Sequence, residues 1–366
     1  MNTIFLEHSL MKVLIAMSGG VDSAVAAKLL TDAGNDCIGC TMKLYRNEDV
    51  GAAPTRTCCS LDDVEDARSV AYRLGMPYYV FNFSDDFREK VIAKFVDSYC
   101  RGLTPNPCID CNRYMKFDRL YRRAALLGCD RIATGHYARI EQQDGKYLLK
   151  KALDFSKDQS YVLYALTQEQ LAHTLFPLGS LHKSETRRIA AQCGLVNAQK
   201  PDSQDICFVP DGDYARVIEL YTGYPAAQGD FVAADGRIIG RHNGLIRYTV
   251  GQHRGLGLSL PERRYVCRLC AENNTVVLGE EADLYRRELT VTDFNWISGQ
   301  APTGAARCRA KLRYRQPEQP ATAFPQEDGS VVLRFDEPQR AVTPGQAAVL
   351  YDGDIVLGGG TIAALE

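Results

Sequence analysis

The stretch KVLIAMSGGVDSAVAAKLL, residues 12 to 30, decides the fold of the first half of the chain. It begins with a short apolar run typical of a buried strand, passes through Ser18, Gly19 and Gly20, and continues into an Ala-rich run that predicts a helix. A strand that enters a helix through glycines is typical of a phosphate-binding loop, because the helix N–H groups and the helix dipole face the turn. The loop lacks the lysine of a Walker motif and carries Asp22 instead. The sequence therefore predicts a phosphate site of another kind.

Asp22 lies inside this glycine-rich turn, where a bound anion would repel a carboxylate. The carboxylate is favourable if it caps the following helix or contacts a Mg²⁺ ion that bridges phosphates. Ser18 and Ser23 add hydroxyl donors to the loop. A loop that binds pyrophosphate and Mg²⁺ suits cleavage of ATP between its α and β phosphates, which would leave AMP on an acceptor oxygen.

Strands and helices alternate from this loop to about residue 134. Short strand–helix connections require parallel pairing, so the predicted fold class is α/β with a doubly wound parallel sheet. Such sheets bind ligands at the carboxyl ends of their strands, where the sequence places the glycine-rich loop, Met42 and the segment that follows Thr134. The expected strands are 12–17, 37–42, 78–82 and 130–134. The expected helices are 22–33, 60–74 with Ser60 as N-cap, 85–99 and 113–127.

The sequence pattern changes beyond about residue 210, where helical periodicity is lost and glycine becomes frequent. From about 285 to the end, six or so short strands are expected, with hairpin signals at QEDGS and YDGDIVLGGG. We therefore predict three domains: a catalytic domain that binds ATP at 1–209, a small β-rich central domain at 210–279, and a C-terminal β-barrel that binds RNA at 280–366.

Composition narrows the class of protein. The 366 residues are 45% apolar and 24% charged, which is ordinary for a soluble globular enzyme. No apolar run is long enough to cross a bilayer, and Glu7 interrupts the first apolar residues, so we expect neither a membrane partner nor a secretory signal. Thirteen cysteines without an export signal indicate a reducing, cytoplasmic location in which most thiols are buried.

A cationic stripe occurs in RCRAKLRYR, where every second residue from 307 to 315 is basic. In a strand this period would place all five side chains on one face. The net charge of −2 argues against indiscriminate binding of nucleic acid, but five cations without a local acid favour an RNA or DNA backbone as the partner. A solvated edge strand guarded by charge is the alternative. The stripe consists of Arg307, Arg309, Lys311, Arg313 and Arg315.

Three cysteines lie in polar stretches of sequence, where a reactive thiol is more plausible than a buried, inert one. Pro105 and Pro107 predict an irregular segment, so Cys108 and Cys111 are expected on a loop. Nearby cations and a helix N-terminus would lower the thiol pKa there. Cys207 follows a second polar stretch, and only the fold could bring it to Cys111. Other interpretations are a metal-binding CxxC pair and a buried thiol at position 207. The nearby cations are Arg101, Arg113 and Lys116.

The motif SGGVDS resembles the PP-loop of the AMP-forming ATP pyrophosphatases. Longer motifs extend the resemblance along nearly the whole chain, and together they are similar to those of the bacterial tRNA-specific 2-thiouridylases. These motifs are AMSGGVDSAVAA, NPCIDCN, ATGHYAR, KDQSYVLYAL, DSQDICF, GLIRYTVGQHRGLG, KLRYRQ and TPGQAAVLYDGDIVLGGG.

The resemblance implies roles for particular residues. Cys111 corresponds to the family's nucleophile and Cys207 to its persulfide-carrying cysteine. ATP binding is implied for Ala16, Met17, Ser18, Gly19, Gly20, Val21, Asp22, Ser23, Met42 and Gly135. Contact with the target base is implied for Asn106, Pro107 and Cys108. Other contacts to tRNA are implied for His136, Lys157, Asp158, Gln159, Tyr314, Arg315 and Gln346.

The resemblance also implies a reaction on the wobble uridine of tRNAs of the lysine, glutamate and glutamine types. ATP with Mg²⁺ adenylates the C2 oxygen of a flipped-out uridine and releases pyrophosphate. A persulfide on Cys207, loaded by a sulfur-carrier protein or a cysteine-desulfurase relay, then supplies sulfur. Cys111 attacks this persulfide, which leaves a Cys111–Cys207 disulfide and AMP.

One position departs from the family pattern, since Cys108 stands where many members have aspartate. An acid–base role would then pass to Asp110 or to water. In an alternative, Cys108, Cys111 and Cys207 ligate a [4Fe-4S] cluster with one iron open for sulfide. Two rival functions remain at this point: a PP-loop synthetase that acts on a small metabolite, and a non-catalytic RNA-binding protein.

Overall fold

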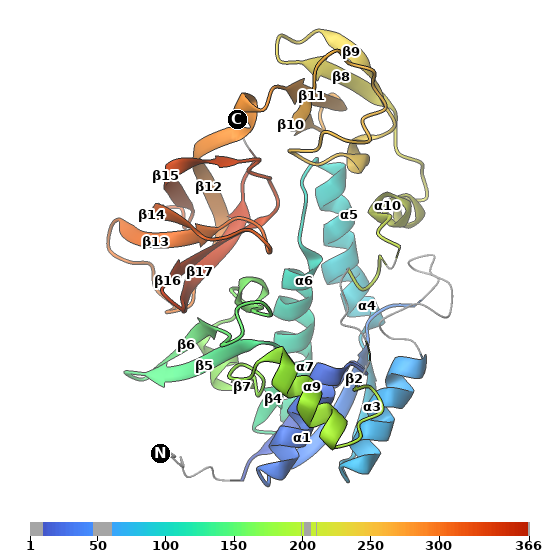
Figure 1. The fold of residues 1–366 in the computed structure, drawn as a ribbon, viewed down its shortest axis with the longest axis vertical. Coiled ribbons are helices and arrows are strands. Elements are labelled where there is room, and N and C mark those ends of the chain that lie inside the picture. The colour runs from blue at the N-terminus through green and yellow to red at the C-terminus, as the bar shows by residue number, and fades with distance from the viewer. Residues whose placement is uncertain (1–9, 47–60, 199, 201–205, 210, 365–366) are drawn as a thin grey trace.

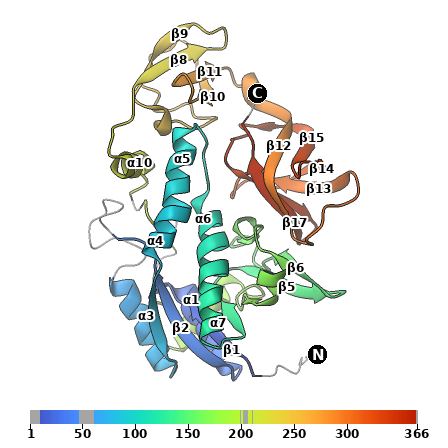
Figure 2. The same cartoon turned by 180° about the vertical axis from the view of Figure 1, so that it is seen from behind.

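The computed structural model describes residues 10–46, 61–198, 200, 206–209 and 211–364. Figure 1 shows a parallel sheet with its helices at one end of the molecule, a small β-sheet unit at the other end, and a β-barrel to one side. Two long segmented helices run from the parallel sheet towards the small unit, and the same two columns are seen side by side from behind in Figure 2.

The N-terminal sheet has five parallel strands in the order β3-β2-β1-β4-β7. The central strand β1 is fully buried at Val13, Leu14 and Ile15, as expected for a strand covered on both faces. Leu14 lies opposite Ile38 on one side and Ile132 on the other. The predicted doubly wound sheet is confirmed. Its strands are β1 Lys12–Ala16, β2 Asp36–Lys43, β3 Tyr78–Asn82, β4 Arg131–Ala133 and β7 Thr174–Leu175.

The helices follow the expected alternation, and both long columns contain a π-helical section. None of the helices in the described ranges is both long and apolar enough to span a bilayer. The expected N-cap Ser60 lies outside the described residues. The helical segments of the first column are α4 Ser84–Phe87, η1 Arg88–Ile92 (π) and α5 Ala93–Cys100. Those of the second are α6 Pro107–Asp110, η2 Cys111–Arg119 (π) and α7 Leu120–Leu126. The others are α1 Val21–Asp32, α3 Leu61–Arg73, α8 Gln168–Ala172, α9 Lys183–Gln192 and α10 Tyr214–Thr222. Short 3₁₀ turns are η3 Ser160–Val162, η4 Leu245–Arg247 and η5 Ala282–Leu284.

The second column begins at Pro107, six residues before the predicted start at 113. Asn106 is its N-cap and accepts a hydrogen bond from the Cys108 backbone N–H at 3.1 Å. Proline is favourable at the first helical position, because its fixed φ suits the helix and its missing N–H is not needed there. The prediction that Cys108 and Cys111 lie on a loop was therefore wrong, since both residues are helical.

The C-terminal barrel is closed, because its first strand β12 pairs with its last strand β17. Both predicted hairpins are present, one between β14 and β15 and one between β16 and β17. An additional hairpin of β5 Ala138–Gln143 and β6 Lys146–Lys151 extends the same sheet through the pairing of Ile355 with Lys150. The barrel strands are β12 Tyr285–Trp296, β13 Ala306–Lys311, β14 Gln319–Pro325, β15 Val331–Arg340, β16 Ala347–Asp352 and β17 Ile355–Ile362.

The cationic stripe is not a single free face. Strand β13 ends at Lys311, so the last two cations lie beyond it. Arg307 pairs with Asp336 at 2.7 Å, and Arg309 Nε lies 3.8 Å from a carboxylate oxygen of Glu318. Asp336 belongs to β15, far along the chain, and Glu318 lies three positions beyond Arg315, outside the segment RCRAKLRYR.

Arg313 also departs from the predicted stripe. Its guanidinium donates to the Ala341 carbonyl at 2.9 Å and to Thr343 Oγ1 at 2.5 Å, so it ties barrel segments together. Tyr314 and Arg315, by contrast, are exposed. Of the cations after the strand, Arg315 is therefore the one available to a ligand.

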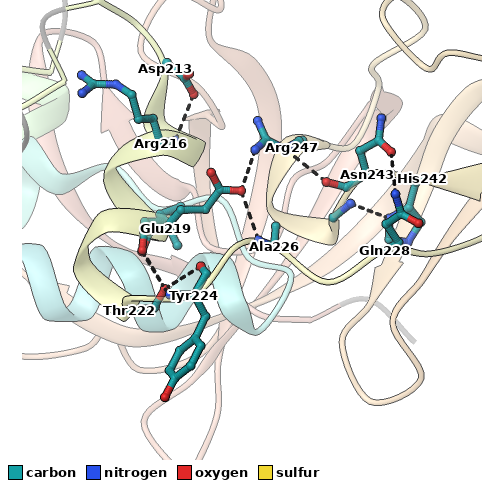
Figure 3. Close-up of polar contacts among 12 residues, drawn as sticks. Asp213, Arg216, Glu219, Thr222, Tyr224, Ala226, Gln228, His242, Asn243 and Arg247 are labelled. Atoms are coloured by element: carbon teal, nitrogen blue, oxygen red, sulfur yellow. Dashed lines mark hydrogen bonds and ion pairs between the residues drawn. The ribbon is translucent and has the colours of Figure 1, made fainter.

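The central unit is a four-stranded sheet around a small core that includes Phe231, Val266 and Val276. Helix α10 is fastened to it by Glu219, whose carboxylate accepts from Arg247 at 2.6 Å and from the Ala226 N–H at 3.1 Å (Figure 3). The strands, in the sheet order β10-β11-β8-β9, are β8 Gly229–Ala233, β9 Ile238–His242, β10 Tyr265–Cys270 and β11 Thr275–Gly279.

The barrel is joined to the segment that precedes α6. The Thr104 N–H donates to the Pro344 carbonyl at 2.9 Å, and Gln346 Nε2 donates to the Thr104 carbonyl at 2.7 Å. Gly345 lies between these two contacts with φ +87°, and a Cβ there would be 2.8 Å from the Thr104 nitrogen. A side chain at position 345 would therefore both strain the backbone and push the barrel away from this segment.

Replacing Gly345 with alanine tests this junction. We expect the free energy of unfolding to fall by about 3 kcal/mol, because the left-handed backbone and the close contact each cost on the order of 1–3 kcal/mol. Gly353→Ala is the matched control, since Gly353 also has a positive φ but has no neighbour within 4 Å of the added Cβ. Its loss should be about 1 kcal/mol. Equal shifts of the urea unfolding midpoint in the two variants would contradict the proposed contact.

Candidate functional site

The glycine-rich loop follows β1, which is the strand at which the strand order reverses. The chain adds β2 and β3 on one side of β1, and β4 and β7 on the other. Gly19 has φ +74°, and a Cβ there would lie 2.4 Å from the Asp63 carbonyl oxygen. Gly20 is the N-cap of α1 and provides no side-chain cap. The first N–H groups of α1 are therefore left for an anion at the switch point of the sheet, where α/β folds bind ligands.

Internal hydrogen bonds hold the loop in shape. Thr41 Oγ1 donates to the Met17 carbonyl at 2.6 Å, and Asn197 Nδ2 donates to the Gly19 carbonyl at 3.1 Å. Ser23 Oγ donates to the Gly20 carbonyl at 3.0 Å and accepts from the Ser18 N–H at 3.2 Å. The expectation that Ser23 offers its hydroxyl to phosphate is therefore corrected, because that proton is used inside the loop. The Ser18 side chain is exposed.

The end of β4 closes the other side of this loop. A Cβ on Gly135 would lie 2.7 Å from the Ser23 nitrogen, so only glycine allows this approach. The remaining residues implied in ATP binding surround the same strand ends. Ala16 and Met42 are half-buried, and Met17 and Val21 are buried.

Asp22 does not cap α1, which corrects one of its two expected roles, because its carboxylate is engaged elsewhere. Lys183 Nζ lies 2.7 and 2.8 Å from the two carboxylate oxygens, and the Tyr137 hydroxyl donates to the same carboxylate at 2.9 Å. Lys183 is the first residue of α9 and comes from 161 residues away. A distant helix thus places a lysine beside the loop, and nothing near the loop in the sequence pointed to it.

Cys111 is the first residue of the π-helical section η2 and is a buried thiol. Burial raises its pKa to about 11, while the charge of Lys116 opposes this shift. The expected lowering of the thiol pKa was therefore wrong. Two of the cations that motivated it are paired with acids: Arg113 with Asp293 at 2.7 Å, and Arg101 with Asp97 at 3.6 Å.

His136 lies behind the Gly135 turn and is 8% exposed. Its Nδ1 is 2.6 Å from Thr134 Oγ1, and its Nε2 is 3.4 Å from Lys116 Nζ. Burial, with a smaller contribution from Lys116, holds its pKa well below the ordinary value, so the ring is neutral. Both ring nitrogens are engaged within the chain, and a contact of this histidine with tRNA stays a prediction.

Cys108 and Asp110 both precede Cys111 in the helical column, and their side chains have different surroundings. Cys108 is exposed, and it contributes with Asp158 to the raised pKa of Tyr314, whose main cause is burial. Asp110 is buried and its carboxylate lies 2.6 Å from Lys94 Nζ, with a pKa raised by burial against the opposing charge of Lys94. Cys108 therefore lies on the side of the barrel, whereas Asp110 is directed towards α5.

Cys207 is half-buried against the same apolar cluster that contains Cys111. Its carbonyl accepts from the Tyr45 hydroxyl at 2.6 Å, close to the end of β2. The next residue, Phe208, packs edge-on against Phe95 at a centroid distance of 5.2 Å. The fold thus brings both cysteines to one cluster, although 96 residues (207 − 111) separate them.

The iron–sulfur alternative finds no matching arrangement. Cys108, Cys111 and Cys207 all belong to the described residues, and within these no group of three or more His, Cys, Asp or Glu side chains could hold a metal ion.

Several of the residues implied in tRNA contact, but not the buried His136, lie between the start of α6, the turn after β6 and the barrel. The Tyr314 hydroxyl donates to the Asp158 carbonyl at 3.3 Å, and Gln159 Oε1 accepts from the Tyr137 N–H at 3.0 Å. Asp158 accepts from Ser160 Oγ at 2.8 Å. Asp158 and Gln159 thus shape the turn, whereas Arg315 is exposed. We call this group of residues the junction face; all of its members except the buried Pro107 are at least partly exposed, and it comprises Asn106, Pro107, Cys108, Lys157, Asp158, Gln159, Tyr314, Arg315 and Gln346.

Comparison with known proteins bears on all three parts of the chain. Residues 11–211 match the family model described as the tRNA methyl transferase HUP domain. Residues 220–280 match the tRNA methyl transferase PRC-barrel domain, and residues 286–362 match the aminomethyltransferase beta-barrel domain. Among solved structures, a 4-thiouridine synthetase–RNA complex with bound ATP has a TM-score of 0.37 at 20% identity, covering 55% of this chain and 46% of that chain.

Two curated relatives match at full length. The tRNA-specific 2-thiouridylase MnmA of Symbiobacterium thermophilum is 52% identical over 357 residues, which cover 96% of this chain and 92% of that protein. The tRNA-specific 2-thiouridylase MnmA of Acetivibrio thermocellus is 52% identical over 354 residues, which cover 96% and 99% of the two chains. Because identity of this order extends over nearly the whole chain, the protein belongs to the tRNA-specific 2-thiouridylase family.

Proposed function

We propose that this protein is a sulfurtransferase that converts the wobble uridine of tRNA to 2-thiouridine. ATP adenylates the C2 oxygen of the base, pyrophosphate is released, and a cysteine persulfide then supplies sulfur while AMP leaves. The observation that carries this proposal is the 52% identity over 96% of the chain to proteins named for this activity. The rival functions, a metabolite synthetase and a non-catalytic RNA binder, have no comparable support.

The adenylation step uses the loop at the switch point of the sheet. ATP and Mg²⁺ enter together as substrate, and the uncapped start of α1 offers backbone N–H groups to the phosphates. Asp22 would hold the Mg²⁺ ion, because carboxylate oxygens are ligands that this hard cation prefers, and one oxygen would exchange its contact with Lys183 for the metal. Lys183 lies against Asp22 and supplies the positive charge that stabilises pyrophosphate as it leaves.

The sulfur-transfer step uses Cys111 as nucleophile and Cys207 as the carrier of the persulfide. The support is their common position on one apolar cluster and their match to the family motifs. A sulfur-carrier protein or a cysteine-desulfurase relay would load Cys207. The cycle ends with a Cys111–Cys207 disulfide that a thiol reductant must reopen, which fits a reducing cytoplasm.

The junction face would receive the anticodon region of tRNAs of the lysine, glutamate and glutamine types. Cys108 is exposed and lies three positions before Cys111 in the same helical column, so a flipped-out uridine that contacts Cys108 would approach the start of that column. Extraction of the base is required, because the C2 oxygen cannot be reached within a stack.

Lys183→Met tests the adenylation step. Loss of this cation should lower tRNA-dependent pyrophosphate release by about a hundredfold, the usual effect of removing one transition-state donor. The control is Lys28→Met on the outer side of α1, where Lys28 pairs with Asp32 and should not matter. Release that does not require tRNA would favour the metabolite synthetase, and no release from the unmodified protein would favour the RNA binder.

Cys111→Ser and Cys207→Ser test the sulfur-transfer step. Each variant should lose 2-thiouridine formation, because a serine hydroxyl can neither carry a persulfide nor attack one, while tRNA affinity stays within about twofold. Cys100→Ser, which replaces an exposed thiol on α5, should keep full activity. Thiolated nucleosides are quantified by mass spectrometry, and sustained thiolation by either of the first two variants would refute the two-cysteine scheme.

Arg315→Ala tests RNA binding at the junction face. Removal of one phosphate contact should reduce the slope of log affinity against log salt by about 0.7–0.9. Arg309→Ala is the matched control, because Arg309 belongs to the same barrel but has Glu318 beside it. If the two variants give the same salt slope as the unmodified protein, Arg315 faces solvent in the complex.

A further inference from the structure

Asn197 is a buried amide that contacts the glycine-rich loop from its inner side. Its side chain is 2% exposed, and its Nδ2 donates to the Gly19 carbonyl at 3.1 Å. Its Oδ1 has no hydrogen-bond partner among the described residues. A buried acceptor without a partner is destabilising, so packing alone does not explain an amide at this position. The feature that an apolar side chain would lack is the donor to the loop.

The segment that carries Asn197 is fastened on both sides of this residue. Arg73 donates to the Gly194 carbonyl at 2.6 Å. Lys200 Nζ lies 2.6 Å from the carboxylate of Asp63, whose backbone carbonyl borders the glycine-rich loop. Both of these contacts come from α3, so this helix holds the segment in place against the loop.

The contact of Asn197 determines the direction of one peptide unit in the loop. The unit between Gly19 and Gly20 is trans, like the other peptide units in the part of the chain that the structure describes. In a trans unit the carbonyl and the N–H point in opposite directions. Because the Gly19 carbonyl points inwards to the buried amide, the Gly20 N–H points outwards. No group of the described residues accepts a hydrogen bond from that N–H.

We propose that Asn197 is a positioning residue for the triphosphate: its amide holds the Gly19 carbonyl inwards and thereby presents the Gly20 N–H to the phosphates of ATP. This N–H lies beside the uncapped start of α1, which offers further N–H groups. Successive backbone N–H groups that point to one side form a concave anion site. The inference rests on the proposed use of this loop for ATP, and it assigns to Asn197 an effect on phosphate binding alone.

Binding of pyrophosphate with Mg²⁺ to the full-length protein, measured by isothermal titration calorimetry, tests this role. Asn197→Ala should raise the Kd for pyrophosphate and for ATP about tenfold, because the freed peptide unit can turn its N–H away from the anion. The Kd for adenosine, which has no phosphate, should stay within about twofold. Asn197→Leu lacks the same donor but leaves no cavity, and it should show the same changes.

Asn112→Ala is the matched control, because Asn112 is also a buried amide, with an exposed fraction of 3%. Its Nδ2 donates to the Val162 carbonyl at 2.9 Å, and its Oδ1 has no partner among the described residues either. This variant should lower the thermal unfolding midpoint as Asn197→Ala does, while its Kd for pyrophosphate stays within about twofold.

Three results would overturn the inference: unchanged pyrophosphate affinity in both variants of Asn197, an equal weakening of pyrophosphate and adenosine binding, or the same loss of pyrophosphate affinity in Asn112→Ala. An unmodified protein that binds neither ATP nor pyrophosphate would instead refute the proposed function.

Discussion

The helix column from Pro107 to Leu126 is the constraint on which the rest of the site depends. It starts beside the barrel and ends beside the parallel sheet (Figure 1), so one helical column extends from the junction face to the sheet. Its N-cap Asn106 and the proline that follows fix where the helix begins, and this start determines where every later side chain points. Cys108 is thereby exposed towards the barrel, and Cys111 is buried one turn later.

The two halves of the proposed reaction meet along this column. The nucleotide loop is closed by Gly135, and the next residue, His136, holds Lys116. The proposed site of adenylation is therefore bounded by Gly135, and the residue after it, His136, contacts Lys116 on the helical column that carries Cys111. Burial raises the pKa of the Cys111 thiol to about 11, and a protonated thiol is less prone to oxidation than a thiolate.

Sequence patterns predicted the parts of the structure that depend on local periodicity. The parallel sheet with its four expected strands, the position of the glycine-rich loop and the C-terminal barrel are confirmed, because strand–helix alternation and hairpin residues are local signals. The short fifth strand β7 was not predicted. The ion pair of Asp22 with Lys183 and the pairing of Arg307 with Asp336 were missed, since their partners are distant in sequence. The domain boundaries at 210 and 280 stay predictions.

The chemistry of Cys111 shows a different limit of sequence reasoning. The number of nearby cations predicted a lowered thiol pKa. The local sequence around Cys111 does not show that Arg113 is paired with Asp293 or that the thiol is buried. It also gave no sign of the π-helical section that begins at Cys111.

The most direct test of the account is the nucleotide product formed for each thiolated base. Purified protein, tRNA, ATP with Mg²⁺ and a persulfide donor should give one AMP and one pyrophosphate for every 2-thiouridine. Formation of ADP and phosphate, or thiolation without any nucleotide consumed, would contradict it.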